Sequence, residues 1–493
     1  MTTSFPIDGI ALDRNGPANL HRQLYRQLRN LIERRVLPSG YALPSTRVMA
    51  RDLRVGRNTV IAACDQLALE GYLAIRPRTP ATVMDLPSAT VTAERASVDG
   101  SNPISRRGQI MLTQPYHHGK PGMLAFHPGM PDPDNFPFNT WARLLGRRAK
   151  LAHFDLFGTY HVRGYPPLCE AIARYLTASR GVKCKPEQIV VTNGAQSAFD
   201  LLARILIDDG DAVWMEEPGY YGAGSAFVSA GAKLSPLKVN ATGWNLDPPP
   251  TVPRLIFVTP SCHHPLGMTM PMEQRLNLIH LAEDWNAWII EDDFDGEYRF
   301  QGQPIPALQG ISASSRVVYV GTFAKVLFPA MRLGFLVVPE LIRDSIDSAL
   351  SVTGQFAPLL TQAALADFMN EGHFTRHLRR MRRLYAERRA YFLAAAERCL
   401  GEWLHFHGTE SGIQMVGIFR TDCDDAAIAR AALDQGINVS PLSMQYRHGK
   451  VQRGLVMGFA AMDANATEKA MVRLRSVLEQ AITAARRAPA GPR

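Results

Sequence analysis

The residues that offer the clearest chemistry lie at positions 321–332, a stretch that reads GTFAKVLFPAMR. The apolar run before it, residues 317–320, is predicted to form a buried strand. Lys325 is therefore expected in a turn at the carboxyl end of that strand, where α/β folds bind ligands. A lysine among apolar neighbours has a lowered pKa, so its neutral amine can attack a carbonyl group. Thr322 and Arg332 offer a hydroxyl and a guanidinium to a phosphate.

The pattern Thr-x-x-Lys by itself is common, and an ordinary surface lysine is its simplest interpretation. Here a buried strand precedes the pattern, aromatic residues are interspersed in it, and Arg332 follows it. These neighbours favour a lysine that forms a Schiff base with pyridoxal phosphate.

A second group of candidate ligands lies at the start of a helix. Residues 188–192 are predicted to form a buried strand, and residues 193–196 (NGAQ) begin a helix that extends to about Ile207. The free N–H groups of Gly194, Ala195 and Gln196, together with the positive end of the helix dipole, suit a phosphate.

Three further loops follow predicted strands at residues 212–215, 255–259 and 287–291. The first loop carries Tyr220, whose ring can stack on a cofactor; the second carries His264, and the third carries Asp292 and Asp293. A carboxylate in such a place can keep a pyridine nitrogen protonated, which makes the ring an electron sink. A metal site is the rival interpretation of this acidic cluster, but its residues lack a fixed ligand spacing, so we expect none.

These motifs belong to a long segment in which helical and strand patterns alternate, from residue 126 to about residue 485. Such alternation predicts an α/β domain with a mostly parallel sheet covered by helices. No apolar run reaches the roughly 18 residues of a membrane span, and Asp8 and Asp13 interrupt any signal pattern. The six cysteines are scattered, without a C-x-x-C pair, which fits a reducing cytoplasm.

The first 84 residues differ from the rest in charge. They contain 12 arginines, no lysine and 6 acidic residues, so they carry +6 of the net charge of +9 on the 493-residue chain. A basic head on a nearly balanced body suggests a polyanionic partner. A solvated basic surface is the plain alternative.

The head is predicted to contain three helices and a hairpin. Residues 20–36 have a helical apolar period, Ser45 caps a short helix to about Leu53, and a third helix runs from Arg57 to about Glu70. The segments 71–75 and 81–84 can pair as a hairpin. This order is typical of an α+β winged helix-turn-helix domain, residues 1–84.

Three motifs, LPSTR at 43–47, RNTV at 57–60 and EGYL at 70–73, resemble the GntR family of bacterial regulators. The resemblance implies a recognition helix in the major groove of double-stranded operator DNA. It implies contacts with phosphates and base edges by Ser45, Arg47, Arg57, Asn58 and Thr59. Helix-start chemistry is the structural alternative for Asn58 and Thr59.

The wing departs from that family, which usually has Gly-Ser-Gly at the tip. Here Pro77 and Pro80 stiffen it, so a minor-groove contact does not carry over. Arg76 and Arg78 remain candidate phosphate ligands.

Residues 85–125 lose all periodicity and are expected to form an extended tether, with a short docking element as the alternative.

The large segment, residues 126–485 before a tail at 486–493, resembles fold-type-I aminotransferases, and the whole chain resembles the MocR subfamily of GntR regulators. The resemblance assigns the Schiff base to Lys325 and the pyridinium nitrogen to Asp292, with Asp293 less favoured. It places Tyr220 on the ring. It places the cofactor's phosphate on Thr322, Arg332 and the backbone of Gly194, Ala195 and Gln196.

Several positions depart from the family pattern. Phe294 replaces a usual tyrosine, so a hydrogen bond to the cofactor's phenolic oxygen is lost; His264 stands where enzymes of this fold have asparagine and is a candidate to replace that bond. The usual Tyr-Gly-Asp-Pro stretch is also altered. Tyr160 or Thr159 is expected to reach a neighbouring subunit's phosphate.

The end of the domain carries the most informative departure. Aminotransferases acting on amino acids have an arginine where Val456 stands, and that arginine clamps the substrate carboxylate. Its loss would weaken amino-acid binding by roughly 1.5–3 kcal/mol. Arg453 is three residues away and would face the other side of a strand. We therefore do not expect ordinary transamination.

A basic helix is predicted at residues 376–389, which contain seven arginines. A solvated face is the favoured interpretation, and a second DNA contact is the alternative.

Together these patterns predict a cytoplasmic, homodimeric transcriptional regulator rather than an enzyme. Its large domain would bind pyridoxal 5'-phosphate and sense an amine, an amino acid or the cofactor itself. A residual half-reaction of the cofactor stays open. The alternative is an active aminotransferase with a vestigial DNA-binding head.

Overall fold

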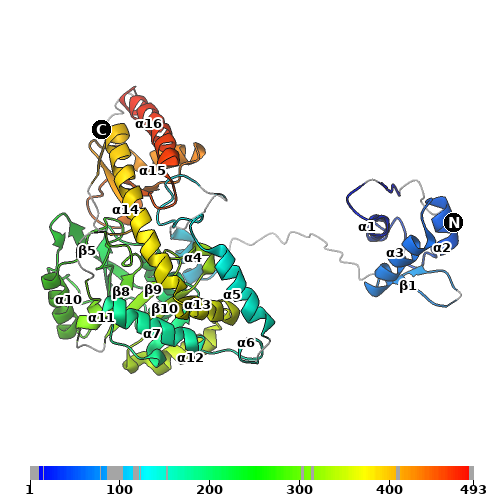
Figure 1. The fold of residues 1–493 in the computed structure, drawn as a ribbon, viewed down its shortest axis with the longest axis horizontal. Helices are drawn as coiled ribbons and strands as arrows, with labels where there is room; N and C mark the ends of the chain where they lie inside the picture. Colours follow the sequence, from blue (N-terminus) through cyan, green and yellow to red (C-terminus); the bar gives the residue numbers. More distant parts are fainter. Residues whose placement is uncertain are drawn as a thin grey trace. The chain divides into compact units, whose positions relative to one another are not determined.

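The computed structural model describes residues 10–14, 16–77, 79–85, 104–114, 122, 124–151, 154–300, 302, 305–312, 316–406 and 411–487. The chain divides into two compact units, Met1–Ser101 and Asn102–Arg493, drawn in Figure 1. Of the candidate DNA-binding residues, Arg78 lies outside the described residues. Among the helices that are described, none is long and apolar enough to cross a membrane.

The first unit has the predicted order of three helices and a hairpin. Its elements are α1 (Leu20–Glu33), α2 (Thr46–Asp52), α3 (Arg57–Leu69), β1 (Leu73–Ala74) and β2 (Thr82–Val83). The helix α1 ends three residues earlier than predicted, because Arg35 adopts a left-handed backbone with φ 58°. Its buried face, with Leu24, Leu28 and Ile32, packs into a core shared with α3 and both strands.

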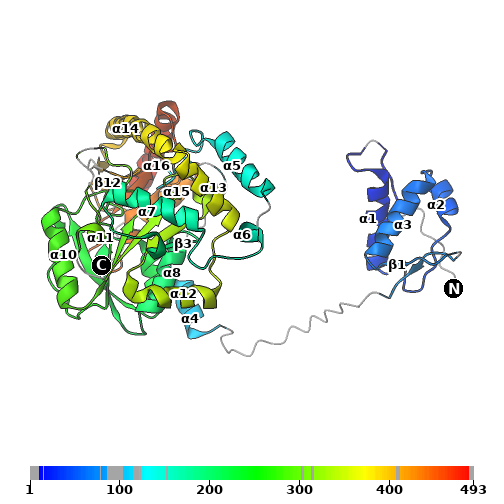
Figure 2. The ribbon, with the colours of Figure 1, turned by 60° about the horizontal axis from the view of Figure 1, so that its bottom comes forward.

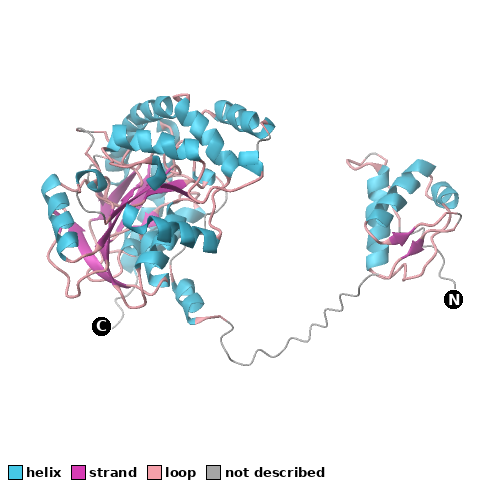
Figure 3. Ribbon diagram, turned by 90° about the horizontal axis from the view of Figure 1, so that it is seen from below, coloured by secondary structure: helices cyan, strands magenta, loops and turns pink. Residues whose placement is uncertain are grey.

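Local turn chemistry sets the helix-turn-helix corner. Ser45 caps α2, as predicted, by accepting a hydrogen bond from the N–H of Val48 at 3.3 Å. The two strands pair antiparallel, with Leu73 opposite Val83. Both of these side chains are buried, so the hairpin closes the core of the unit beside its helices (Figure 3).

The second unit is built on an eight-stranded sheet of order β3-β10-β9-β8-β7-β4-β5-β6. Its strands are β3 (Ile189–Thr192), β4 (Ala212–Glu217), β5 (Lys233–Asn240), β6 (Gly243–Trp244), β7 (Leu255–Val258), β8 (Trp288–Asp293), β9 (Val317–Thr322) and β10 (Gly334–Val337). The central pairs from β5 to β9 are parallel, whereas β10 and β6 pair antiparallel. The predicted mixed, mostly parallel sheet is confirmed, although β5, β6 and β10 were not predicted.

Helices cover both faces of this sheet (Figures 2 and 3). They are α5 (Phe138–Lys150), α6 (Phe154–Phe157), α7 (Pro166–Arg180), α8 (Ala195–Leu206), α9 (Tyr221–Ser229), α10 (Met272–Asp284), α11 (Leu308–Ile311), α12 (Arg343–Thr353), α13 (Leu359–Asn370) and α14 (His373–Leu400). Successive strand residues alternate between the two faces. Phe257 and Ile290 therefore pack with α8, α9 and α12, while Ile256 and Ile289 pack with α10 and α11.

A second, four-stranded antiparallel sheet follows α14, in the order β11-β12-β14-β13. It consists of β11 (Leu404–Phe406), β12 (Gln414–Phe419), β13 (Ser440–Pro441) and β14 (Gly454–Gly458), with α15 (Asp425–Asp434) and α16 (Ala464–Arg487). Residues from the start of the unit also join this sheet. Ala125 bridges to Ile437, and the N–H of Gly458 donates to the carbonyl of Phe126 at 2.9 Å.

The predicted tether is not extended throughout. It contains the helix α4 (Arg106–Thr113), whose first turn is capped by the hydroxyl of Ser105, which accepts from the N–H of Gly108 at 3.1 Å. This helix contacts α9 and belongs to the second unit (Figure 2). The docking element left open by the sequence is thus present, because a short capped helix needs no long apolar periodicity.

The basic stretch at 376–389 lies on α14 and is only partly solvated. Arg382 donates to the carbonyl of Glu297 at 2.6 Å, and Arg388 pairs with the buried Asp132 at 2.6 Å. Exposed on the same helix are Arg379, Arg380 and Arg383. Arg382 is exposed as well, so the predicted solvated face holds for most of the stretch and is wrong for Arg388, which anchors α14.

Candidate cofactor site

Lys325 lies just beyond the carboxyl end of β9, as the sequence predicted. Its Nζ donates a hydrogen bond to the carbonyl oxygen of Gly129 at 2.9 Å. Burial lowers the pKa of Lys325, and the nearby carboxylates of Asp295 and Asp292 act in the opposite direction. The side chain is thus an amine that gives up its proton more readily than a surface lysine.

Gly129 completes this arrangement, although its sequence context did not indicate such a role. A Cβ at this position would lie 2.0 Å from the Nζ of Lys325, and the backbone φ is +65°. Gly458 of β14 makes room for the same segment, because a Cβ there would lie 2.0 Å from the carbonyl oxygen of His127. A glycine in a proline-rich loop was the available signal, but nothing in the sequence links it to a lysine 196 positions later.

The predicted phosphate ligands converge around Gly334 of β10. This residue pairs with Thr192 of β3 on one side and with Thr322 of β9 on the other. Gly194 follows β3 with φ +88°, a conformation that favours glycine, and α8 begins at the next residue. Arg332 donates to the carbonyl of Asn193 at 3.2 Å, and a Cβ on Gly194 would lie 3.8 Å from its guanidinium carbon.

One candidate phosphate site is therefore surrounded by the free N–H groups at the start of α8, the Thr322 hydroxyl and the Arg332 guanidinium. Thr322 is buried, and its Oγ1 accepts from the N–H of Ala324 at 3.2 Å. The side chain of Gln196 instead donates to the carbonyl of Gly222 at 2.9 Å, so this residue offers its backbone. A helix N-terminus with an adjacent arginine is a strong phosphate site.

Asp292 and Asp293 point to opposite faces of β8, as successive strand residues must. The Oδ2 atom of Asp293 is held by the Nε of Arg180 at 2.7 Å and by the hydroxyl of Tyr319 at 2.6 Å. Asp292 is 4% exposed, and its Oδ1 has no hydrogen-bond partner among the described residues. Burial, reinforced by Asp293, raises the pKa of Asp292 well above its usual range.

Tyr220 and His264 lie beside one another in the same region. Their rings meet edge to face with centroids 5.3 Å apart, and His264 in turn meets Phe294 at 5.6 Å. Gly222 leaves space for the tyrosine, because a Cβ there would lie 2.5 Å from the ring carbon that bears the hydroxyl. Burial raises the pKa of Tyr220 to about 12, so its hydroxyl stays protonated.

Tyr160 occupies a different position. It is 62% exposed, and its ring stacks on Phe356 with centroids 4.7 Å apart. The carbonyl of Phe356 accepts from the side chain of Asn193 at 3.5 Å, so Tyr160 lies near the surface end of the phosphate cradle. The described contacts do not place it on the cofactor site of its own subunit.

Two buried carboxylates near the site were missed. Asp295 is fully buried, accepts from the N–H of Ile413 at 3.2 Å, and has a pKa raised by burial to about 7. Glu216 accepts from the indole N–H of Trp244 at 2.6 Å, and burial likewise raises its pKa to about 7. Asp295 belongs to the acidic motif already noted, but its role depends on Lys325 lying close in space.

Val456 shows what replaces the carboxylate clamp. It is 1% exposed and packs with Val416 and Leu442 in an apolar cluster. Arg453 is turned away and pairs with Asp425 at 3.2 Å. The clamp position is therefore apolar.

No group of three or more His, Cys, Asp or Glu residues in the described ranges is placed to hold a metal ion.

The candidate DNA-binding residues lie together at the α2–α3 corner. Arg57 begins α3, and its Nε donates to the Thr46 hydroxyl of α2 at 3.2 Å. Exposed beside them are Ser45, Arg47, Asn58 and, on the hairpin, Arg76. Thr59 is half-buried, and its N–H donates to the carbonyl of Gly56 at 2.9 Å.

Residues 20–83 match the gntR family of bacterial regulatory proteins, and residues 131–474 match the class I and II aminotransferase family. The chain is 51% identical over 470 residues to the probable rhizopine catabolism regulatory protein MocR of Rhizobium meliloti, covering 95% of each protein. This chain belongs to the MocR subfamily of GntR-family regulators.

Other MocR-type relatives also span both units. The chain is 29% identical to the pyridoxine biosynthesis regulator PdxR of Corynebacterium glutamicum, with coverage of 92% of this chain and 95% of that protein. Enzymes match the second unit instead. The 2-aminoadipate transaminase of Thermus thermophilus is 27% identical and covers 76% of this chain and 93% of its own length.

Solved structures show the same fold for the second unit. An archaeal alanine:glyoxylate aminotransferase superposes with a TM-score of 0.67 at 24% identity, covering 73% of this chain and 91% of its own. LysN of Thermus thermophilus, complexed with N-(5'-phosphopyridoxyl)-L-leucine, gives a TM-score of 0.67 at 24% identity, with coverage of 77% and 96%. The fold is that of fold-type-I aminotransferases.

The full-length relatives are regulators, so this MocR-subfamily protein is a DNA-binding transcriptional regulator rather than an enzyme, and its cofactor is pyridoxal 5'-phosphate. The residues present fit this cofactor. The orphaned Oδ1 of Asp292 suits the protonated ring nitrogen, and the cradle at Gly194 and Arg332 suits the phosphate. When bound, the cofactor supplies a carbonyl that reacts with amines and a ring that withdraws electrons.

Proposed function

We propose that this regulator is a cytoplasmic homodimer whose affinity for operator DNA changes when a primary amine reaches the cofactor at Lys325. The observation that carries the proposal is the apolar cluster at Val456, where a substrate-carboxylate clamp would need a cation. The site therefore keeps groups suited to cofactor capture but lacks one that amino-acid turnover requires.

In this proposal each candidate residue has one role. Lys325 holds the cofactor covalently, and Asp292 accepts a hydrogen bond from the protonated ring nitrogen. Tyr220 lies against the ring, with His264 beside the cofactor's phenolic oxygen. Thr322, Arg332 and the N–H groups at 194–196 bind the phosphate. In the head, which ends near residue 84, the exposed side chains at the α2–α3 corner contact DNA, and Arg76 contacts a phosphate on the wing.

The amine need not carry an α-carboxylate. A lost charge-assisted contact weakens a carboxylate ligand by roughly 1.5–3 kcal/mol, whereas an amine without that group loses nothing. The relative at 51% identity is named for rhizopine catabolism, so rhizopine is a compound to test here. Cofactor vitamers are the second candidate effector, because the relative PdxR is named for pyridoxine biosynthesis.

The homodimer is supported by Tyr160, which lies near the phosphate cradle. It is 62% exposed, so its ring is available to a partner subunit. Exposed aromatic side chains are enriched at interfaces. In the dimer, Tyr160 or Thr159 would reach the partner's phosphate.

The test is a coupled titration of the cofactor-loaded protein. Amines, matched α-amino acids and free pyridoxal phosphate are added while the visible absorbance of the cofactor and the affinity for operator DNA are both measured. We expect an amine to change both, and DNA to change the amine affinity by the same factor, because linkage is reciprocal. Steady turnover of an amino donor with a keto acceptor, with no effect on DNA affinity, would contradict the proposal.

A further inference from the structure

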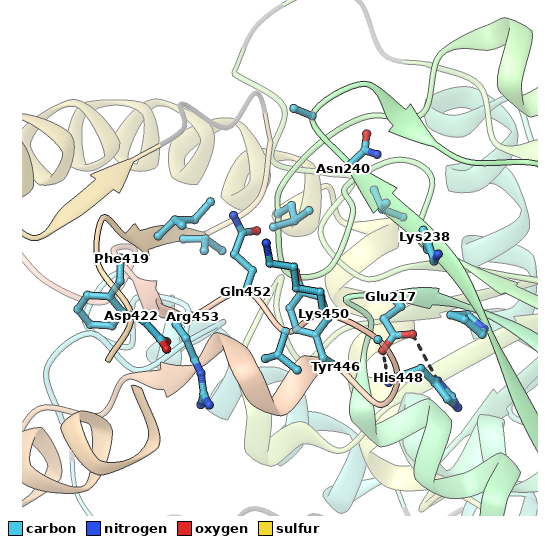
Figure 4. Close-up of a pocket in the computed structure, with 18 of the residues that line it drawn as sticks. Glu217, Lys238, Asn240, Phe419, Asp422, Tyr446, His448, Lys450, Gln452 and Arg453 are labelled. Carbon is cyan, nitrogen blue, oxygen red and sulfur yellow. Dashed lines mark hydrogen bonds and ion pairs between the residues drawn. The ribbon is translucent and has the colours of Figure 1, made fainter. Parts of the chain in front are cut away.

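The second unit contains a cavity of about 1260 Å³ whose lining includes none of the candidate cofactor residues (Figure 4). Its lining comes from the end of β5, from the end of β12 with the turn after it, and from the loop at 446–453. Lys325, Asp292 and Arg332 are not part of the lining. The volume is that of a site for a small organic ligand rather than for a single ion.

One wall of the cavity is apolar. Leu266, Val416, Ile418 and Tyr446 line it and also belong to the cluster that packs on Val456. These side chains offer contact to the body of a ligand. Because the same cluster borders Val456, the cavity lies behind the place where an aminotransferase would have its carboxylate clamp.

The polar part of the lining has an excess of positive charge. Its cations are Lys238, Arg420, Lys450 and Arg453, and its carboxylates are Glu217 and Asp422. Some of these charges are already engaged. Glu217 accepts from the N–H groups of Arg447 and His448, and Arg453 pairs with Asp425.

Within the described part of the chain, the side-chain ammonium groups of Lys238 and Lys450 make no hydrogen bond or ion pair. Both residues are exposed and line the cavity. In Figure 4, Lys450 lies near the middle of the cavity, between Lys238 on the β5 side and Asp422 on the side of the small sheet. Two uncommitted ammonium groups above an apolar wall match a ligand with an anionic end and an apolar body.

We propose that this cavity is a second small-molecule site, which takes an organic anion with a carboxylate or phosphate near Lys238 and Lys450 and its apolar body on Leu266 and Tyr446. The site is separate from the cofactor cradle. It does not depend on whether an amine is the effector.

The loop that carries Lys450 is also tied to α4 through Arg447. The backbone N–H of Arg447 donates to Glu217 at 2.7 Å, and its guanidinium donates to the carbonyl of Tyr221 at 3.3 Å and to Gln114 at 3.2 Å. Gly224 leaves space for this side chain, because a Cβ there would lie 3.0 Å from its Nε. A ligand that orders the loop therefore acts on the residue that holds the end of α4.

The test of the site uses the full-length, cofactor-loaded protein in a buffer without phosphate. Calorimetric titration with phthalate and with phenyl phosphate is expected to give saturable binding of at least one probe, which also identifies the preferred anionic group. The Lys238→Met/Lys450→Met double variant is expected to bind at least about tenfold more weakly. Lys183→Met/Lys233→Met, at exposed positions outside the cavity, is the matched control and should bind as the parent does.

Three results would overturn the site. The first is that neither probe binds, and the second is that the double variant binds as tightly as its control. The third is that Lys325→Ala abolishes binding, which would place the probe in the cofactor cradle. Inorganic phosphate binding as tightly as phenyl phosphate would overturn the assignment of the apolar wall.

The link to α4 is measured by hydrogen exchange with the better probe. We expect the probe to slow exchange at residues 106–114 in the parent, and Arg447→Met to remove that response. The link would be refuted if the exchange rate at these residues were the same with and without bound probe in the parent protein.

Discussion

The two units of this protein place their functional groups in opposite ways. In the head, the side chains assigned to DNA are mostly exposed and come from one short stretch, residues 45–76. In the second unit, Lys325, Asp292 and Gly129 come from distant segments and meet in the interior. Local turn chemistry is enough to build the first site, whereas the second exists only after the whole unit has packed.

This difference predicts different responses to substitution. An exposed contact contributes its own binding energy, so its loss is graded and leaves the fold intact. A buried group contacts side chains and backbone from several segments, so its loss removes the function of the whole site.

Lys325→Ala is expected to abolish covalent cofactor attachment and the response to amines. DNA affinity without ligand should stay within about twofold, because the residues assigned to DNA all lie in the first unit and no amine is present to act on the second. Borohydride reduction followed by mass spectrometry measures the attachment, and a DNA-binding titration measures the head. Lys183→Ala, at an exposed position, is the control. Loss of DNA binding in Lys325→Ala would show that the two units are not separable.

Gly129→Ala is expected to slow cofactor capture by about 100-fold, since a Cβ there would displace the Nζ of Lys325. Gly354→Ala is a closely matched control, because its φ is +63° against +65° and no atom lies within 4 Å of the added carbon. Both variants carry a backbone cost of about 1–3 kcal/mol. Equal capture rates, measured by stopped-flow absorbance, would refute the contact with the lysine.

Arg57→Ala is expected to weaken operator binding by about 1–3 kcal/mol if the side chain reads a base, or to lower the salt slope by about 1 if it meets a phosphate. Arg51→Ala is the matched control in the same unit, because that guanidinium pairs with Asp52 at 2.8 Å. Binding titrations at several salt concentrations separate the outcomes. Equal losses in both variants would mean that only net charge matters.

Asp295→Asn is expected to shift the pH profile of cofactor capture. The carboxylate of Asp295 raises the pKa of Lys325, so its removal lowers that pKa and makes the neutral amine available at lower pH. Because burial raises the pKa of Asp295 itself to about 7, parent and variant should agree below that pH and differ above it.

Capture rates between pH 6 and pH 9, bracketing that value, measure this shift, and Asp247→Asn, at an exposed position, serves as control. A profile that moves to higher pH would show that the carboxylate does not act on Lys325.

The sequence predicted most of the fold because its signals were local. Ser45 followed by a helical pattern specified a cap, and the apolar run before Lys325 specified a strand, and both were confirmed. The strand β10 was missed because a four-residue apolar run is too short for periodicity to identify it as a strand. The strand β5 was missed because it contains Pro236, and proline within a run argues against a strand. The helix α4 was too short for periodicity to reveal it.

In the candidate site, too, the residues with local signals were predicted and those defined by spatial contacts were missed. Residue type and position after a strand pointed to Lys325, Asp292 and Arg332, and the structure brings them to one edge of the sheet; their individual roles stay predictions. Gly129 and Asp295 were missed because each matters only through its closeness to Lys325 in space, which the sequence does not show. Tyr160 was expected at the phosphate of a neighbouring subunit, and this stays a prediction.

By itself the sequence determined the two units, the chemistry of their motifs and the apolar residue at 456, because hydrophobic period, caps and residue types are properties of short stretches. The tertiary structure decided which carboxylate stays unpaired, which carbonyl holds the lysine and where a second cavity opens. Asp292 and Asp293 are neighbours of the same type, and only the face of β8 on which each lies, with Arg180 beside one of them, separates their chemistry.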